Sequence, residues 1–506
     1  MEFLVVMEVS QKQNYIFKTN RLAENIGASI LIRSITESLA KEIAVEIEEK
    51  YQQTCEIILE GGGKSIYAFT SEECAREFVR RMSRTALEKY PGVELFFARH
   101  SYNESSQTII DVMNSLYQKL EEKKAVRESA FRIFDLGITK QCESTQLPAV
   151  AVNESGQYIS AESKVKLEVA KEKQGEIFTQ LLPAAEGKKY RFANVFAELG
   201  GDKDSKSFLA LTVIDGNKMG KKIEKFNDIF LKKHSQADCT FNTAYKQEYR
   251  ALSQKIDGLY KEAMKKTMEH LAINIESLIK RDIITKRVDE DGTIVLPIRP
   301  LILAGDDICF VSDARIGLAL TKEILLHIEE SVLEELDEMK MCACAGIAIV
   351  KVRYPFYSAH ELAEELCHNA KAALEEGEDE SIIDFHIVQG EKEGSLSQIR
   401  KEKYKGASLT NKPLYLKKQA GKSNTIPVFE EHLKILRSGK IGRSALIGYR
   451  TALSNSAGKQ FITEKRFKER LKKELGFEMP DSYVNGKCID FDVLEMLDMY
   501  NLLEEV

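Results

Sequence analysis

The sequence predicts an α+β protein with two ferredoxin-like (βαββαβ) domains in tandem, a small connector between them and a C-terminal helical bundle. Two observations predict this fold class. One order of strand and helix patterns occurs in residues 1–130 and returns in residues 206–390. Residues 131–205 are polar and mixed, and residues 391–506 begin with a basic stretch and continue in helical patterns. These four ranges are the predicted domains.

The first domain opens with a strand and a long helix. Isoleucines recur at helical spacing through the helix, and the hairpin that follows turns through three glycines. The expected elements are the strand Phe3–Val9, the helix Leu22–Tyr51, strands at Ile57–Leu59 and Ser65–Phe69 around Glu60-Gly61-Gly62-Gly63-Lys64, the helix Glu73–Tyr90, the strand Val93–Arg99 and the helix Ser106–Lys124.

The second domain repeats this scheme, so the chain resembles a duplication of one palm-like unit. A long insertion, Phe241–Lys280, has the apolar spacing of a packed helical hairpin or of one long helix. The other expected elements are the strand Phe208–Asp215, the hairpin Leu301–Val311, the helix Arg315–Leu336, the strand Met341–Val352, the helix Ala359–Glu376 and the strand Ile382–Val388.

Three aspartates mark the second domain. Asp306 and Asp307 occupy the turn of the hairpin, where Gly-Asp is also ordinary turn chemistry. Asp215 ends the strand Phe208–Asp215. If these strands are neighbours, three carboxylates converge, enough to hold two Mg²⁺ or Mn²⁺ ions about 4 Å apart for phosphoryl or nucleotidyl transfer. The first domain has Glu8 where the second has Asp215, and its hairpin turn lacks the paired carboxylates.

A phosphate-binding segment is expected beside these carboxylates. After Asp215 the chain continues as Gly216-Asn217-Lys218-Met219-Gly220 and then turns helical. A helix N-terminus offers free N–H groups and a dipole that favours phosphate, so these residues and Gly305 of the hairpin are candidate nucleotide contacts. The alternative is a plain strand-to-helix turn capped by the aspartate.

Composition limits the remaining classes. The chain has 506 residues, of which 30% are charged and 43% hydrophobic, and a formal charge of −6. This balance argues against a large non-specific nucleic-acid footprint. No apolar run approaches the roughly 18 residues of a membrane span, and the chain starts with a strand pattern rather than a signal peptide, so a cytoplasmic location is expected. Nine scattered cysteines without a C-x-x-C pair support neither disulfides nor zinc.

The C-terminal region begins with a basic stretch, Arg400–Lys422, expected to be loop-like. It is either solvated surface or a segment near phosphates or RNA. The bundle beyond it is expected to contain the helices Val428–Ser438, Ser444–Ser456, Thr463–Leu475 and Phe491–Leu503.

Several motifs together resemble the CRISPR polymerase family, the large subunit of type III (Csm and Cmr) effector complexes. The second palm domain of that family is resembled by Leu296–Asp307, Asp215–Gly220, Ala345–Val350, Tyr354-Pro355-Phe356 and Ala370-Lys371, and its first palm by Glu8–Phe17 and Gly27-Ala28-Ser29. The resemblance covers nearly the whole chain. It implies a cyclase-like polymerase that converts ATP, or another nucleoside triphosphate, into a cyclic oligonucleotide messenger for antiviral defence.

The resemblance also implies roles for individual residues. Asp215 and Asp306 would hold the two metal ions with the Gly216 carbonyl, and Asp307 would complete the acidic pair. Lys371 matches the phosphate-binding lysine of related cyclases, although an exposed helix lysine is an equally good interpretation. Implied partners are the nucleoside triphosphate, guide or target RNA and other effector-complex subunits; several copies of this chain could also assemble.

The sequence departs from the family in three places. Ala304 replaces the first glycine of the Gly-Gly-Asp-Asp turn. No His-Asp dipeptide occurs, so the HD nuclease domain and its DNA cleavage are expected to be absent. Near Cys142, the residues Thr145, Ser160 and Ser163 stand where the family has zinc-binding cysteines, which we interpret as a lost zinc site. The competing hypothesis is therefore a non-catalytic palm-fold scaffold that binds nucleotide, RNA or partner subunits.

Overall fold

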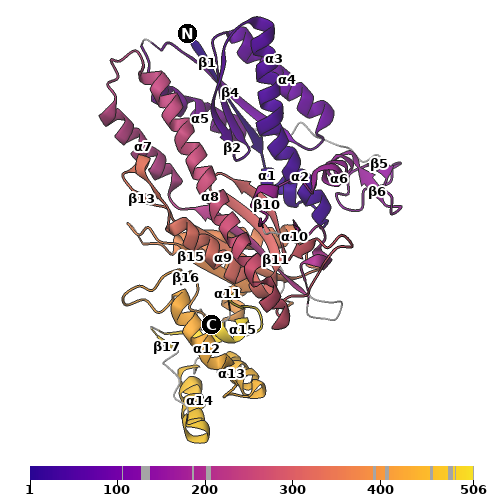
Figure 1. Cartoon of the computed structure of the whole chain (residues 1–506), viewed down its shortest axis with the longest axis vertical. Coiled ribbons are helices and arrows are strands. Elements are labelled where there is room, and N and C mark those ends of the chain that lie inside the picture. The colour runs from indigo at the N-terminus through magenta and orange to yellow at the C-terminus, as the bar shows by residue number, and fades with distance from the viewer. Residues whose placement is uncertain are drawn as a thin grey trace.

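The computed structural model describes residues 1–504 except 105, 127–136, 185–186, 201–206, 376, 391–394, 405–408, 456–459, 477–482 and 485. It is a mixed α/β structure, as the sequence predicts. Figure 1 shows the N-terminal sheet at the top, a second sheet in the middle and the C-terminal helices at the bottom. Within the described residues, no helix combines the length and hydropathy needed to cross a membrane.

The first sheet has four antiparallel strands in the order β2-β3-β1-β4. Side chains of its central strand alternate between two cores. Val5 and Met7 pack with the helices of residues 22–51 and 72–89, whereas Leu4 and Val6 face the helices of residues 109–125 and 241–280. The strands are β1 (Glu2–Ser10), β2 (Cys55–Gly61), β3 (Lys64–Phe69) and β4 (Glu94–Tyr102).

The helices of this domain follow the predicted order. The expected helix Leu22–Tyr51 is continuous but passes through a π-helical segment, Ser34–Leu39. A short helix that precedes Leu22 was not expected. Its first residue, Lys12, contacts the candidate active site. The helices are α1 (Lys12–Phe17), α2 (Leu22–Arg33), α3 (Ala40–Tyr51), α4 (Glu72–Lys89) and α5 (Ile109–Ala125).

The second sheet repeats the strand order of the first. Its first four strands lie in the order β10-β11-β8-β14, which is the same second-third-first-fourth arrangement, and two more strands extend the sheet beyond β14. The strands are β8 (Phe208–Gly216), β10 (Ile298–Ala304), β11 (Asp307–Asp313), β14 (Ala343–Lys351), β15 (Ile382–Ile387) and β16 (Leu414–Tyr415).

Helices cover both faces of the second sheet. Helix α10 packs on β8 and β14, and α9 packs on the opposite face beneath α8. The insertion Phe241–Lys280 is one helix rather than a helical hairpin. The helix expected to reach Leu336 ends at Glu329, because a short hairpin buries Leu333 and Leu336 instead. Bounds are α7 (Met219–Lys233), α8 (Phe241–Lys280), α9 (Ala314–Glu329), α10 (Phe356–Ala372), β12 (Val332–Leu333) and β13 (Met339–Lys340).

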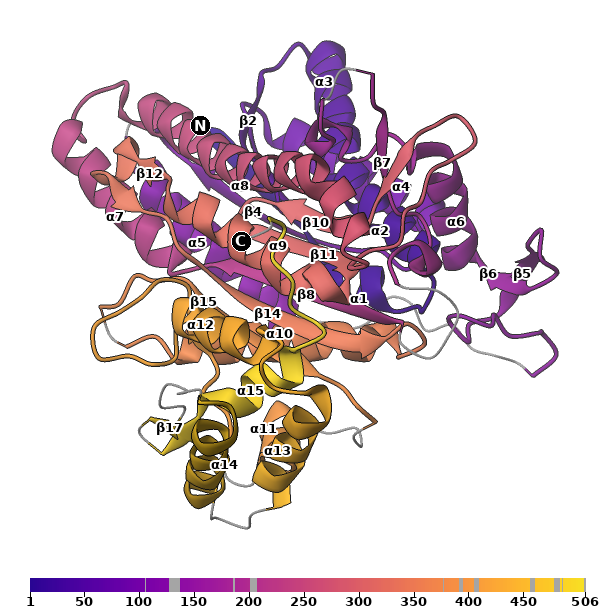
Figure 2. The same cartoon turned by 60° about the horizontal axis from the view of Figure 1, so that its bottom comes forward.

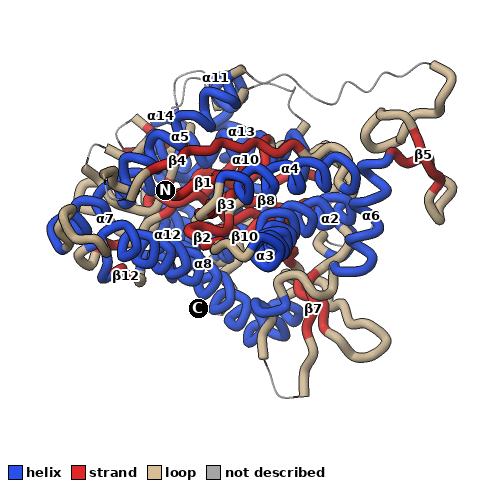
Figure 3. Tube along the Cα trace, turned by 90° about the horizontal axis from the view of Figure 1, so that it is seen from above, coloured by secondary structure: helices blue, strands red, loops and turns tan. Residues whose placement is uncertain are grey.

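The connector lies against the first domain and partly projects from it. In Figure 3, β5 stands away from the body while α6 lies beside α2. A second part of the connector pairs in parallel with a strand of the second domain. The elements are β5 (Ala149–Val152), β6 (Tyr158–Ser160), α6 (Ala161–Lys173), β7 (Tyr190–Phe192) and β9 (Ile294–Leu296).

The C-terminal region consists mainly of helices below the second sheet (Figure 2). The last of them, expected over Phe491–Leu503, ends at Met496, and the chain then runs in an irregular path. The elements are α11 (Leu396–Lys403), α12 (Ile426–Arg437), α13 (Arg443–Asn455), α14 (Gln460–Leu475), β17 (Tyr483–Val484), β18 (Lys487–Cys488) and α15 (Ile489–Met496).

The basic stretch Arg400–Lys422 is not the exposed loop that its composition indicated. Arg400 lies in α11 and forms a 2.5 Å ion pair with buried Asp384. Lys412 is fully buried and lies 3.3 Å from Asp492 of α15. Buried cations require partners, so these charges join the C-terminal helices to the sheet rather than face phosphates. Residues 405–408 of this stretch lie outside the described residues.

Candidate active site

The acidic turn (Gly305, Asp306 and Asp307) connects two central strands of the second sheet. Gly305 and Asp306 form the turn, and Asp307 is the first residue of β11. The register pairs Ile308 with Ile214 of β8, which places Asp307 beside Asp215. The structure therefore brings the three predicted carboxylates together from adjacent strands.

Burial and mutual repulsion shape the electrostatics of these carboxylates. Burial, with smaller contributions from the negative charges of Asp307 and Asp215, raises the pKa of Asp306 to about 6. The pKa of Asp215 is also raised, chiefly by burial and less by Asp307, although Lys371 opposes this change. Clustered carboxylates with raised pKa values are common at functional sites and are relieved by a bound cation.

Two lysines contact the acidic cluster. The Nζ atom of Lys371, on α10, lies 2.5 Å from Oδ2 of Asp215 and donates to the Gly216 carbonyl at 3.1 Å. Lys12, on α1 of the first domain, lies 2.9 Å from Oδ2 of Asp307 and donates to the Gly62 carbonyl at 3.0 Å. Sequence reasoning missed Lys12 as a site residue, because no local pattern connects positions so distant in the chain.

Gly216 allows the closest approach in the site. A Cβ atom at this position would lie 2.7 Å from Oδ2 of Asp306 and 2.8 Å from the hydroxyl of Tyr260. Any side chain would therefore displace one of these groups. The Gly216 carbonyl faces Lys371 on the other side, so glycine holds β8 close to both the acidic turn and α10.

The predicted phosphate-binding segment is partly occupied by internal contacts. The N–H of Asn217 donates to the Cys342 carbonyl at 2.9 Å, so the prediction that this N–H is free for phosphate is wrong. The side chain of Lys218 donates to the Glu378 carbonyl, and its backbone has a positive φ of 53°. Met219 and Gly220 form the first turn of α7. The Gly305 N–H donates to Asp257 of α8 at 3.2 Å.

The types of donor at the site match hard divalent cations, although the side chains are not already arranged around an ion. Three carboxylates and one backbone carbonyl, that of Gly216, are oxygen ligands of the kind that Mg²⁺ and Mn²⁺ prefer. Among the described residues, however, no group of three or more His, Cys, Asp or Glu side chains is placed to hold a metal ion, so these carboxylates would have to rearrange to bind one. Burial and the charges of Asp307 and Asp215 raise the pKa of Asp306, and a bound cation would oppose this rise. Asp215, Asp306, Asp307 and the Gly216 carbonyl would hold the ions.

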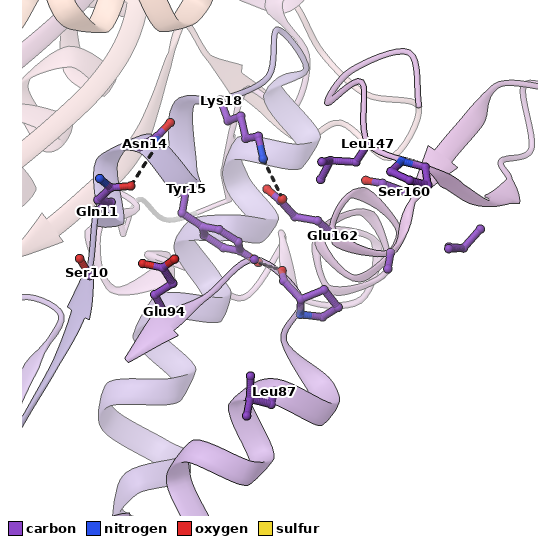
Figure 4. Close-up of a pocket in the computed structure, with 15 residues that line it drawn as sticks. Ser10, Gln11, Asn14, Tyr15, Lys18, Leu87, Glu94, Leu147, Ser160 and Glu162 are labelled. Carbon is purple, nitrogen blue, oxygen red and sulfur yellow. Dashed lines mark hydrogen bonds and ion pairs between the residues drawn. The ribbon is translucent and has the colours of Figure 1, made fainter. Parts of the chain in front are cut away.

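A separate cavity lies between the first domain and the connector (Figure 4). Its volume is about 390 Å³, and none of the predicted site residues lines it. Tyr15 of α1, Gln11 just before that helix and Lys18 just after it line the cavity, and Lys18 forms a 3.1 Å ion pair with Glu162 of α6. Lys12, on the same helix, reaches Asp307 instead.

The suspected remnant of a zinc site is a cluster of hydrogen-bonding side chains. The thiol of Cys142 lies 3.6 Å from the Ser163 hydroxyl, and Thr145 donates to Ser160 at 3.0 Å. The Ser163 hydroxyl in turn donates to Glu24 of α2 at 3.0 Å. The four positions named from the sequence are therefore neighbours, and they attach the connector to the first domain.

Comparisons with solved structures agree with this fold. Csm1 of T. onnurineus superposes with a TM-score of 0.55 at 14% identity, covering 98% of this chain and 69% of that one. A Csm1-Csm4 cassette in complex with cA4 gives 0.52 at 13% identity, with the same coverage. A Csm1-Csm4 subcomplex of the type III-A CRISPR-Csm interference complex gives 0.50 at 14%, covering 98% and 70%. At this identity the likeness shows the fold. No curated protein sequence matches the chain.

The family itself is indicated by a sequence match. Residues 208–380 match the family model described as Cas10/Cmr2, second palm domain. This range contains Asp215, the acidic turn and Lys371. Over residues 208–380, this match confirms the resemblance to the CRISPR polymerase family that the sequence predicts.

Proposed function

We propose that this protein is a two-metal nucleotidyltransferase that converts ATP into a cyclic oligonucleotide messenger in CRISPR-type defence. The observation that carries the proposal is the convergence of Asp215, Asp306 and Asp307 inside a matched Cas10/Cmr2 second palm domain. We further propose that both sheets are copies of one ferredoxin-like palm unit, because their first four strands share one order. The solved structure with bound cA4 supports a cyclic oligoadenylate as the product class.

The residues of the chain perform separate tasks in this reaction. The three aspartates and the Gly216 carbonyl would hold two Mg²⁺ or Mn²⁺ ions. When bound, such ions neutralise the triphosphate and lower the pKa of the attacking ribose hydroxyl. Lys371, which contacts Asp215, is placed to move to a phosphate oxygen once a cation neutralises that carboxylate. We propose no zinc, since hydroxyls occupy the corresponding connector positions.

The proposal is tested by incubating the purified protein with each labelled nucleoside triphosphate and Mg²⁺ or Mn²⁺. Mass spectrometry of the products, together with pyrophosphate release, identifies the base and the product. We expect an oligonucleotide from the wild type and none from Asp306→Ala/Asp307→Ala. A product that persists in this double variant would place the chemistry elsewhere.

The second candidate is a non-catalytic scaffold that binds nucleotide, RNA or partner subunits. One observation favours it: ammonium groups of Lys12 and Lys371 already neutralise Asp307 and Asp215. The solved neighbours in which Csm1 is paired with Csm4 support a subunit partner of that kind.

The scaffold is distinguished from the enzyme by two measurements on the wild-type protein. A scaffold co-purifies with guide RNA or small subunits and releases no pyrophosphate from ATP, whether or not it binds the nucleotide. Pyrophosphate release that requires Mg²⁺ and disappears in Asp306→Ala/Asp307→Ala excludes the non-catalytic role.

A further inference from the structure

Helix α8 runs past β10 of the second sheet (Figure 1) and contacts several parts of the molecule. Near its start, Lys246 forms ion pairs with Glu2 and Glu56 of the first sheet, at 3.0 and 2.9 Å. Near its end, His270 lies 2.7 Å from Glu504 of the C-terminal tail. Its middle packs on β10 and α9, which puts the helix directly against the acidic turn.

Asp257 and Tyr260 lie one helical turn apart on α8, and both approach the acidic turn. Oδ1 of Asp257 accepts the Gly305 N–H at 3.2 Å, while its other oxygen pairs with Lys261 at 2.5 Å. This contact holds the backbone of the turn at the position where Gly305 has a positive φ of 63°. A carboxylate that accepts a backbone N–H forms a strong, directional hydrogen bond.

Tyr260 is the second residue. Its side chain is fully buried, and its hydroxyl has no hydrogen-bond partner among the described residues. A buried hydroxyl without a partner costs free energy, so its retention requires a reason. That hydroxyl and Oδ2 of Asp306 lie 2.8 and 2.7 Å from the same point, the Cβ position that Gly216 leaves empty.

We infer that α8 positions the acidic turn: Asp257 fixes its backbone through Gly305, and Tyr260 is the hydrogen-bond donor held for the Asp306 carboxylate when that carboxylate binds a cation. Ligating carboxylates are ordinarily oriented by such outer hydrogen bonds. The role of Tyr260 rests on the proposed two-metal function, whereas the role of Asp257 does not. Both are positioning residues rather than catalytic ones.

The role of Asp257 is tested by hydrogen exchange on the full chain without metal or nucleotide. In Asp257→Ala, amides of the 301–311 hairpin should exchange roughly tenfold faster, because a charge-assisted hydrogen bond is lost. Asp257→Asn keeps an acceptor oxygen and should restore slow exchange. The first-domain hairpin at residues 57–69 serves as an internal reference that does not change. Unchanged exchange of the 301–311 hairpin in Asp257→Ala overturns this role.

The role of Tyr260 is tested by Mn²⁺ binding, measured by electron paramagnetic resonance, together with the melting temperature. Tyr260→Phe should weaken Mn²⁺ binding about five- to tenfold without lowering the melting temperature, because it removes a hydroxyl that is unpaired in the metal-free protein. A merely structural tyrosine would leave Mn²⁺ binding unchanged, and that result overturns the inference.

The matched control is Tyr245→Phe on the same helix. The Tyr245 hydroxyl donates to Asn227 at 2.8 Å, about 22 Å along the helix from Tyr260 at 1.5 Å per residue. This variant should melt lower and bind Mn²⁺ as the wild type does. A wild type that binds no Mn²⁺ would overturn the proposed function and the role of Tyr260, while the exchange experiment would still decide the role of Asp257.

Discussion

The hairpin turns of the two sheets occupy the same place in the same strand order but carry opposite charge. In the first domain, the third strand begins with Lys64 and lies beside Glu8 of the first strand. In the second domain, the third strand begins with Asp307 and lies beside Asp215. The Lys64–Glu8 pair of the first domain thus corresponds to the Asp307–Asp215 pair of the second. A cation beside an anion at one turn is replaced by two anions at the other.

The first-domain carboxylate is already satisfied. Glu8 forms ion pairs with Lys64 at 3.0 Å and with Lys124 at 2.6 Å. Burial alone would raise the pKa of Glu8, but hydrogen bonds and charge from these two lysines outweigh burial and lower it. Asp306 of the second domain has the opposite shift, to about 6. The strand order is therefore the same in both sheets, whereas the charges of three or four side chains at the two turns differ.

The largest expected effect is on activity, from Asp215→Asn compared with Glu8→Gln. Asp215→Asn removes a metal-ligand charge and should reduce metal-dependent pyrophosphate release by about 10³-fold or more. Glu8→Gln removes the carboxylate that pairs with Lys64 and Lys124, so it should lower the free energy of unfolding by about 1 to 2 kcal/mol. Turnover per folded molecule should remain nearly unchanged. Steady-state kinetics and thermal melts separate the two results. Equal losses of turnover would show that both turns take part in catalysis.

A smaller effect is expected on stability as a function of pH. In the folded protein the pKa of Asp306 is about 6, above its ordinary value of 3.8. The folded state therefore holds this proton more tightly, and the cost of ionising Asp306 grows as pH rises from about 4 to 6. Metal-free wild type should gain about 1 kcal/mol of stability from Asp306 between pH 7 and pH 5, with allowance for its partial exposure.

The control for this prediction is Asp306→Asn, which cannot ionise and should lack that gain. Asp215, Asp307 and Lys371 remain in both proteins, so the difference between their melting curves isolates Asp306. Saturating Mg²⁺ should reverse the trend in the wild type, because a bound cation favours the ionised carboxylate. Identical pH profiles for the two proteins would show that folding does not raise the pKa of Asp306.

Much of the difference between the two hairpins is predictable from the sequence, because it depends on local sequence patterns. Short apolar runs ending in Asp215 or flanking the acidic turn predict strands, and the repeated order of these patterns predicts the strand order that the two sheets share. Helix ends are less predictable: apolar residues up to Leu336 continue a helical pattern, although the chain buries them in a hairpin. The periodicity of apolar residues indicates that they are buried, but it does not indicate whether a helix or a hairpin buries them.

Long-range partners could not be predicted in the same way. Lys12 reaches Asp307, and Tyr260 reaches the acidic turn from an insertion whose pattern indicated only packing. The basic stretch that contains Lys412 is predicted to be either solvated surface or a segment near phosphates or RNA, because composition does not show that Asp492 is buried beside Lys412. Whether a charged residue forms an internal ion pair or part of a binding surface depends on which residues the fold places beside it.

The smallest expected effect concerns Lys12, which connects the first domain to the acidic turn. Lys12 competes with a cation for Asp307, and its partly exposed ion pair is worth about 1 kcal/mol. Lys12→Met should therefore tighten Mn²⁺ binding about threefold to fivefold in the absence of nucleotide, measured by electron paramagnetic resonance. Lys64→Met, in the equivalent first-domain turn, should leave Mn²⁺ binding unchanged. Weaker binding in Lys12→Met would instead mean that Lys12 holds Asp307 in the orientation that the metal requires.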